Sequence, residues 1–169
     1  MAGLTLIELM VVISVVAILL AIATPSFMKT IQRNRVATEV NSLVADLQLA
    51  RGQAIKEGMP VTVCISNDGA SCSTTLKTWQ TGWISFSDSN ANHVVDSGET
   101  ILRRQVAFSG TDTFGNGSTS WITYSRDGFL SPLGASGDVT LTLDTSPTNA
   151  DAKRCLVLSI VGRQKVASC

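Results

Sequence analysis

LTLIELMVVISVVAILLAIAT, residues 4–24, is the stretch that decides how the rest of the chain is interpreted. As a helix rising about 1.5 Å per residue, these 21 residues would extend roughly 32 Å, close to the ~30 Å hydrocarbon core of a bilayer. A carboxylate inside such a helix costs about 2.5 to 3.5 kcal/mol to insert, so Glu8 is expected to have a partner or a function. The segment predicts a single membrane-spanning helix.

A cleaved secretory signal peptide is the alternative for this segment. It would have a basic start before the apolar stretch and a small-x-small cleavage site after it. Here the small residue Gly3 comes before the apolar run, and the chain continues through Pro25 and Phe27 into a helical pattern without a linker. This order of features favours a retained anchor.

Composition limits what the remainder can be. The chain has 169 residues, with 13 basic and 13 acidic side chains, so it has no global field that would attract nucleic acid or a cationic partner. Any binding based on charge must be local. The expected organisation is a leader remnant at residues 1–3, a transmembrane helix at 4–24, an amphipathic stem helix at 25–57 and one β-rich globular domain at 58–169.

The stem is predicted from apolar residues that recur at three- and four-residue steps. The pattern ends at Gly58 and Pro60, where a helix stop is expected. Pro25 lies inside the combined helix, so a bend is predicted near residues 21–25. The apolar positions are Phe27, Ile31, Val36, Val40, Leu43, Val44, Leu47, Ala50, Ala54 and Ile55.

After Pro60 the hydrophobic period shifts toward two, with clusters of turn-forming residues between the apolar runs. Strands are predicted at residues 61–65, 82–86, 100–108, 120–125, 139–143 and 155–161. The fold class is therefore α+β, with the long helix packed on a mostly antiparallel β domain. Packing in the core or at its rim is expected for the large aromatic side chains Trp79, Trp83, Trp121 and Tyr124.

The four cysteines occur as two close pairs. Delivery outside the cytoplasm by the anchor favours disulfides over metal thiolates. Each pair would close a short loop, and the second would hold the C-terminus in place. The predicted bonds are Cys64–Cys72 and Cys155–Cys169.

Gly3-Leu4-Thr5-Leu6-Ile7-Glu8 resembles the class III leader junction of type IV pilins and type II secretion pseudopilins. The resemblance implies that a prepilin peptidase cuts after Gly3 and methylates the new amino group of Leu4. It also implies that Glu8 pairs with the amino group of an adjacent subunit, and that Pro25 is the family's helix-bending proline. Such a chain starts as a single-pass protein of the bacterial inner membrane and then enters a periplasmic or extracellular pilus.

Later motifs resemble one branch, the GspH/FimT family of minor pilins and pseudopilins. They are LQLARGQAI at 47–55, PVTV at 60–63, GWISFSD at 82–88 and GETILR at 98–103, with residues 124–130 and Gly162-Arg163 also fitting. This implies a structural subunit, usually near the tip, that contacts other pilins or pseudopilins through its helix. Two machines remain open: a type IV pilus, and a type II secretion system with this chain as a minor pseudopilin.

One loop has the spacing of calcium ligands. Residues 88–99 place oxygen donors at positions 1, 3, 5, 9 and 12 of the calcium-loop template, but His93 stands where that template needs glycine. The loop is thus either a calcium site or a solvated hairpin loop, and no other cofactor is expected. The donors are Asp88, Asn90, Asn92, Asp96 and Glu99.

Local positive charge gathers near the C-terminus, in Lys153, Arg154 and the sequence Gly162-Arg163-Gln164-Lys165. Family members that serve natural transformation have a similar Gly-Arg-x-Arg element and bind DNA with it. Lys165 stands in place of the second Arg of that element: it has the same charge but lacks the planar guanidinium that can bind a phosphate with two hydrogen bonds. Two strands joined near Gly162 are expected to present all four cations at one end. The element is either a charged hairpin tip or a contact for double-stranded DNA.

An enzyme is not expected. His93 is the single histidine, and the sequence contains no nucleophile elbow, Walker loop or zinc-binding histidine pair. No set of residues supplies a nucleophile, a base and an oxyanion donor together.

Overall fold

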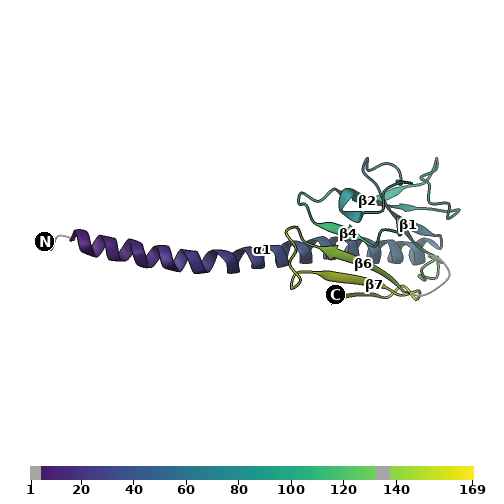
Figure 1. The fold of residues 1–169 in the computed structure, drawn as a ribbon. Coiled ribbons are helices and arrows are strands. Elements are labelled where there is room, and N and C mark those ends of the chain that lie inside the picture. Colours follow the sequence, from purple (N-terminus) through teal and green to yellow (C-terminus); the bar gives the residue numbers. More distant parts are fainter. Residues whose placement is uncertain (1–4, 132–137) are drawn as a thin grey trace.

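The structure is a computed structural model that describes residues 5–131 and 138–169, with the backbone alone for residues 22–26. A long helix, α1, leaves a β-rich head, so that the N-terminal end lies far from the head and the C-terminus beside it (Figure 1). The elements in chain order are α1 Leu6–Glu57, β1 Val61–Ile65, the 3₁₀ helix η1 Trp79–Thr81, β2 Gly82–Ser87, β3 Ile101–Val106, β4 Thr113–Gly115, β5 Trp121–Tyr124, β6 Val139–Asp144, β7 Arg154–Leu158 and β8 Gln164–Ser168.

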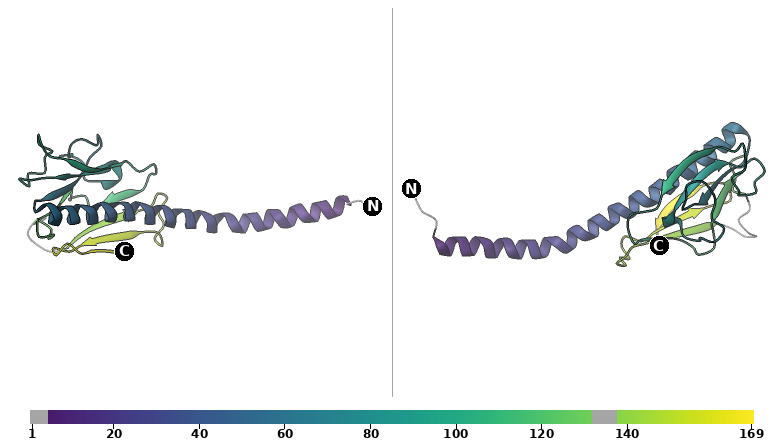
Figure 2. Two further views of the ribbon diagram at one scale, coloured as in Figure 1. Left: turned by 180° about the vertical axis from the view of Figure 1, so that it is seen from behind. Right: turned by 90° about the horizontal axis from the view of Figure 1, so that it is seen from above.

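Helix α1 is continuous and is capped at both ends. The Thr5 side chain accepts a hydrogen bond from the Glu8 amide, and Gly58 adopts a left-handed conformation with its N–H donated to the Ala54 carbonyl. The helix passes through residues 22–26 without a break and curves along its length (Figure 2). The two predicted helical segments therefore form a single stem.

The C-terminal half of α1 packs on the head through one buried stripe. The predicted positions Phe27, Ile31 and Ile55 are 43–66% exposed and lie outside this stripe, whereas its members are at most 1% exposed and follow steps of four and three residues as predicted. They are Val36, Val40, Leu43, Leu47, Ala50 and Ala54. Asp46 adds a polar link beside this stripe, because its carboxylate accepts hydrogen bonds from Trp83 Nε1 at 2.9 Å and Arg103 Nε at 3.2 Å.

The head contains two antiparallel sheets of four strands each. One has the order β3-β2-β1-β5 and the other the order β4-β6-β7-β8. Both contribute to the core under α1, in which Trp79, Trp83 and Tyr124 are fully buried. Strand β1 is buried along its whole length, since its other face packs in a smaller cluster with Phe86 and the Cys64–Cys72 disulfide. The predicted α+β class, with a long helix packed on antiparallel sheets, is thereby confirmed.

Five of the predicted strands match β1, β2, β3, β5 and β6 in position. The predicted strand at 155–161 is wrong at its end, because β7 stops at Leu158 and residues 159–163 form the turn to β8. Two bonds hold that turn: the Ser159 amide donates to the Arg163 carbonyl and the Gly162 amide to the Ser159 carbonyl. Strand β8 was expected only as an unbounded strand after Gly162, and the sequence predicted neither β4 nor the 3₁₀ helix η1.

Both predicted disulfides are present. Cys64–Cys72 and Cys155–Cys169 have Cα–Cα distances of 5.5 and 5.3 Å. The second joins the start of β7 to the last residue, so the C-terminus is held against the sheet.

No helix is both long enough and apolar enough to cross a membrane, judged on the residues that the structure describes. The predicted span at 4–24 includes Leu4 and the side chains of residues 22–24, which lie outside that description.

Candidate assembly and nucleic-acid interfaces

The N-terminal half of α1 presents a long apolar surface. Its large apolar side chains from Leu6 to Leu20 are 47–77% exposed, and Phe27 and Met28 continue the surface toward the head. An apolar surface of this extent marks a contact with a membrane or another protein. The same helix therefore combines an unpartnered apolar half with a half that packs on its own head (Figure 1).

Glu8 is the one acidic residue in the first turn of α1. Its backbone amide donates to Thr5 Oγ1 at 3.3 Å, so the Thr5 side chain caps the N-terminus of α1. The Glu8 carboxylate makes no hydrogen bond or ion pair with the described parts of the chain. Ser14, in contrast, satisfies its hydroxyl locally by donating to the Met10 carbonyl at 2.7 Å.

The structure does not test the predicted leader cleavage after Gly3, the methylation of Leu4 or the role of the Pro25 side chain. Gly3 and Leu4 fall in the undescribed N-terminus, and Pro25 is described by its backbone alone.

The hairpin of β7 and β8 carries the Gly-Arg-x-Lys sequence at its turn. Gly162 has a φ of 75°, a left-handed conformation that favours glycine. Arg163 closes the turn, and Lys165 lies in β8 opposite Val157. Residues two apart in extended chain share a face, so both cations point to the same side. Both side chains are exposed, and neither forms an ion pair within the described ranges.

The prediction that all four C-terminal cations lie at one end is wrong. The register pairs Leu158 with Gln164 at the turn and Arg154 with Ser168 at the other end of the hairpin. Arg154 begins β7 and Lys153 precedes it, so both lie at the far end of the hairpin from the turn. Lys153 also forms an ion pair with Asp144 at 3.0 Å. The four cations are close in the sequence, but the direction of β7 places Lys153 and Arg154 at the end of the hairpin opposite to Arg163.

Arg51 lies in the 47–55 motif, but the sequence did not indicate the contacts that its side chain makes. From α1 it donates three hydrogen bonds to loop carbonyls: Nε to Gly128 at 2.9 Å, Nη1 to Gly162 at 3.1 Å and Nη2 to Val161 at 3.0 Å. The fork of the guanidinium thus joins the turn of the cationic hairpin to the loop before residue 131. In the sequence, Arg51 looks like any charge on the polar face of a helix.

Residues 39–162 match the family described as type II transport protein GspH. This match covers most of the chain, from Glu39 in α1 to the turn before β8. The chain belongs to the GspH family. Over 97% of its length it is also 29% identical to the pilin-like protein PilA1 of Thermus thermophilus, of which 97% is covered.

Solved structures agree with this GspH-family chain at the level of the fold. Two crystal forms of the type IV minor pilin FimU of Pseudomonas aeruginosa have TM-scores of 0.60 and 0.54, each at 22% identity. They cover 80% and 78% of this chain and 90% of FimU. The family match shows a member of the GspH family, and the shared fold is that of a pilin-like α+β protein.

The 88–99 loop of this GspH-family chain is held by its own hydrogen bonds. Glu99 accepts from the amides of Ser89 and Asp96, and the side-chain amides of Asn90 and Asn92 donate to Asp96. Asp88 is fully buried and accepts from the Thr62 hydroxyl at 2.7 Å. No group of three or more acidic, histidine or cysteine side chains that could hold a metal occurs in the described residues. Oxygens of Asp88, Asp96 and Glu99 are thus engaged by donors of the protein itself, and calcium binding by the loop stays a prediction.

Proposed function

We propose that this chain is a minor subunit of a type IV pilus, placed near its tip, that joins the filament through its apolar stem. The observation that carries the proposal is the division of α1 into an exposed apolar half and a half buried against the head. A chain with this division can present its head to solvent while the apolar half packs among other stems. This is a structural role, and we propose no catalysis.

The N-terminal motif extends this proposal to the route of assembly. The chain would begin in the inner membrane, lose its leader after Gly3 by the action of a prepilin peptidase and carry a methylated Leu4. Glu8, which has no partner within the described chain, would then pair with the amino group of a neighbouring subunit. The low dielectric around packed apolar stems would strengthen this ion pair.

Contact with DNA for uptake in natural transformation is an added function in this proposal. Its support is the pair Arg163 and Lys165, exposed on one face of a hairpin whose turn is anchored by Arg51. Cations presented this way would contact phosphates, so binding would be largely independent of base sequence.

A minor pseudopilin of a type II secretion system is the second candidate, favoured by the description of the matching family. The two candidates predict different phenotypes for a deletion strain. A pilus subunit is recovered in sheared surface filaments, and its loss reduces piliation and DNA uptake. A pseudopilin is missing from surface filaments, and its loss blocks protein secretion. Immunoblots of sheared filaments and of the culture medium, compared with a complemented strain, decide between them.

A further inference from the structure

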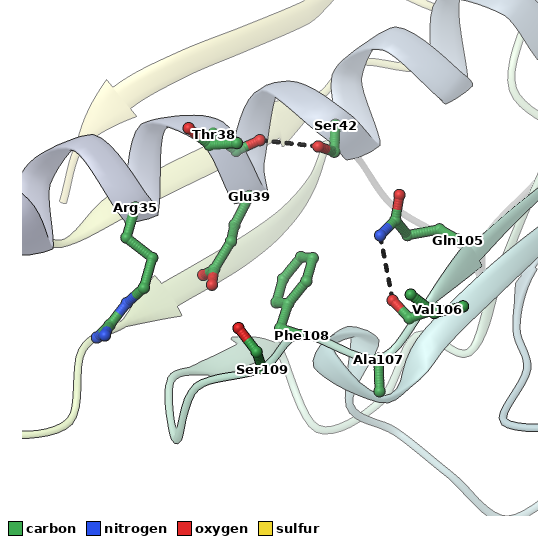
Figure 3. A pocket seen from close by; sticks show the side chains of 9 residues that line it. All are labelled: Arg35, Thr38, Glu39, Ser42, Gln105, Val106, Ala107, Phe108 and Ser109. Atoms are coloured by element: carbon green, nitrogen blue, oxygen red, sulfur yellow. Dashed lines mark hydrogen bonds between the residues drawn. The ribbon is translucent and has the colours of Figure 1, made fainter.

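A pocket of about 450 Å³ lies between α1 and the segment that leaves β3 (Figure 3). Arg35, Thr38, Glu39 and Ser42 form its helical wall, and residues 105–109 form the opposite wall. We name it the flank pocket. It lies on the side of the stem, where α1 enters the head, and Val106 at its rim is 77% exposed.

Glu39 is the unusual group of the flank pocket. The residue is only 7% exposed, and its Oε2 atom is buried without a hydrogen-bond partner in the described structure. Figure 3 shows the carboxyl group directed from α1 toward Phe108 and Ser109. A buried acceptor without a donor is destabilising, so a donor brought to the Glu39 carboxyl group would be favourable.

The neighbouring cation, Arg35, is paired with another carboxylate and makes no hydrogen bond to Glu39 in the described structure. Arg35 donates from Nε and Nη2 to the two carboxylate oxygens of Asp112, at 2.7 Å each. Asp112 is 2% exposed and also accepts from the Ser146 amide at 2.9 Å. This cluster therefore holds two carboxyl groups and one guanidinium, which leaves one carboxyl group without a counter-charge.

The pKa of Glu39 is raised, in agreement with this excess of carboxyl groups over guanidinium groups. Burial raises the pKa of Glu39 to about 7, the charge of Asp112 adds to this rise, and Arg35 opposes it. Near neutral pH the carboxyl group is consequently shared between a protonated form and an anion. A cation that binds beside it would stabilise the anion and displace the proton.

The helical wall of the pocket offers hydroxyl oxygens as acceptors, because the protons of its two hydroxyl groups are already donated. The Thr38 hydroxyl donates to the Asn34 carbonyl and the Ser42 hydroxyl to the Thr38 carbonyl, at 2.9 Å each. A hydroxyl that has donated its proton can still accept. An ammonium, with three donors on a compact head, suits such a set better than a planar guanidinium does. The Phe108 ring and Val106 provide apolar surface for the aliphatic part of a lysine side chain.

We propose that the flank pocket binds the ammonium group of a lysine side chain from a neighbouring subunit, with the Glu39 carboxylate as the anionic acceptor. The identity of the occupant rests on the proposed function, since the stem is the surface through which subunits would assemble. The preference for a cation rests on Glu39, Arg35 and Asp112 alone. An anionic occupant such as a phosphate is disfavoured by the surplus carboxylate.

The cation preference is tested on the full chain in detergent micelles. The probe is Nα-acetyl-lysine methylamide, and the isosteric control is Nα-acetyl-norleucine methylamide. NMR of the Glu39 carboxyl carbon follows its pKa, which the lysine probe should lower and the norleucine probe should leave unchanged. Because protons compete with the probe at a group of pKa about 7, affinity should rise up to about thirtyfold between pH 5.5 and 8.

Two variants distinguish binding in the flank pocket from a non-specific effect of negative charge on the helix. Glu39→Gln keeps the shape of the side chain and should weaken the lysine probe roughly tenfold at pH 8, because a charged acceptor is lost. Glu57→Gln removes a carboxylate from the exposed end of the same helix and should bind as the wild type does. Equal binding of lysine and norleucine probes, or undiminished lysine binding by Glu39→Gln, would overturn the proposal.

The occupant is tested in assembled material. A benzophenone amino acid in place of Val106 is photoactivated in sheared filaments, and the crosslinked peptides are identified by mass spectrometry. The expected product joins this chain to a lysine-containing segment of another subunit. Crosslinks confined to segments without lysine, to lipid or to DNA overturn the assignment. Absence of the chain from filaments refutes both the proposed function and this occupant, while the micelle titration still decides the chemistry of the pocket.

Discussion

Arg51 on the stem donates from Nη1 to the carbonyl of Gly162, 111 residues away, at a distance of 3.1 Å. The bond fixes the turn of the cationic hairpin against α1, together with the two other carbonyls that Arg51 contacts. The position of Arg163 relative to the stem is therefore set by the helix and not by the hairpin alone. This relationship makes the turn sensitive to changes that leave its charge untouched.

Gly162→Ala should destabilise the chain. A Cβ atom at this position would clash with the Gly128 carbonyl oxygen and lie 2.9 Å from Arg51 Nε, and the φ of 75° is unfavourable for alanine. The conformational cost is roughly 1–2 kcal/mol, and the crowding adds about 1–3 kcal/mol. Gly117→Ala is the matched control. Gly117 has a similar φ of 73°, but a Cβ atom added there would meet no atom within 4 Å. Equal losses of stability in thermal unfolding of the two variants would contradict the packing at Gly162.

Replacing Arg163 and Lys165 together by Gln should remove most DNA binding. Loss of two phosphate contacts should also reduce the slope of log affinity against log salt by about two. The measurement is a titration of the full chain in detergent against a fluorescent duplex at several salt concentrations.

The matched control for DNA binding exchanges Lys153 and Arg154 for Gln. It removes the same charge from the far end of the hairpin, so it should change the affinity much less if the turn is the contact. Comparable losses in the two double variants would show a general charge effect. No association of the wild type at low salt would eliminate the DNA function.

Glu8→Leu should reduce recovery of the chain in sheared filaments while membrane insertion continues. The reason is that the substitution removes the carboxylate proposed to pair with a neighbour and makes the helix more apolar. Thr5→Ala serves as the control, because it removes the hydroxyl that caps the helix and keeps the carboxylate. Normal incorporation of Glu8→Leu would refute the assembly role of Glu8.

Stability should fall as the pH rises through the range set by Glu39. The pKa of this carboxyl group rises from 4.5 to about 7 on folding, so the folded state holds more protons than the unfolded state between these values. The stabilising contribution is complete below pH 4.5 and is lost above about pH 7, with an upper limit of about 3 kcal/mol. Arg35 and Asp112 are the charged groups that act on it. Denaturant unfolding of Glu39→Gln should lack this part of the pH dependence, whereas Glu57→Gln should retain it.

Calcium at millimolar concentration should leave the melting temperature of the chain unchanged. The oxygens of Asp96 and Glu99 are already engaged by donors of the loop itself, so an ion would have to displace these bonds. An increase in melting temperature that disappears in Glu99→Gln would instead establish a calcium site, since preferential binding stabilises the folded state.

Some features of this protein were determined by the sequence because they depend on neighbours along the chain. The steps of four and three residues from Val36 to Ala54 define one helical face whatever it packs on, and this face is buried as predicted. The short loops between Cys64 and Cys72 and between Cys155 and Cys169 restrict which cysteines can meet. The N-terminal motif is equally local.

Other features were decided only by the tertiary structure, because they depend on which distant segments come together. Strand β4 has three residues, and its Phe114 amide bonds to Gln80 Oε1, which no pattern within residues 113–115 could indicate. The direction of β7 separates Arg154 from Arg163, although the sequence suggested a single cluster. Arg51 and Glu39 appear in the sequence as ordinary helix charges. Their roles arise because folding brings loop carbonyls to the first and leaves the second buried beside an arginine that is already paired.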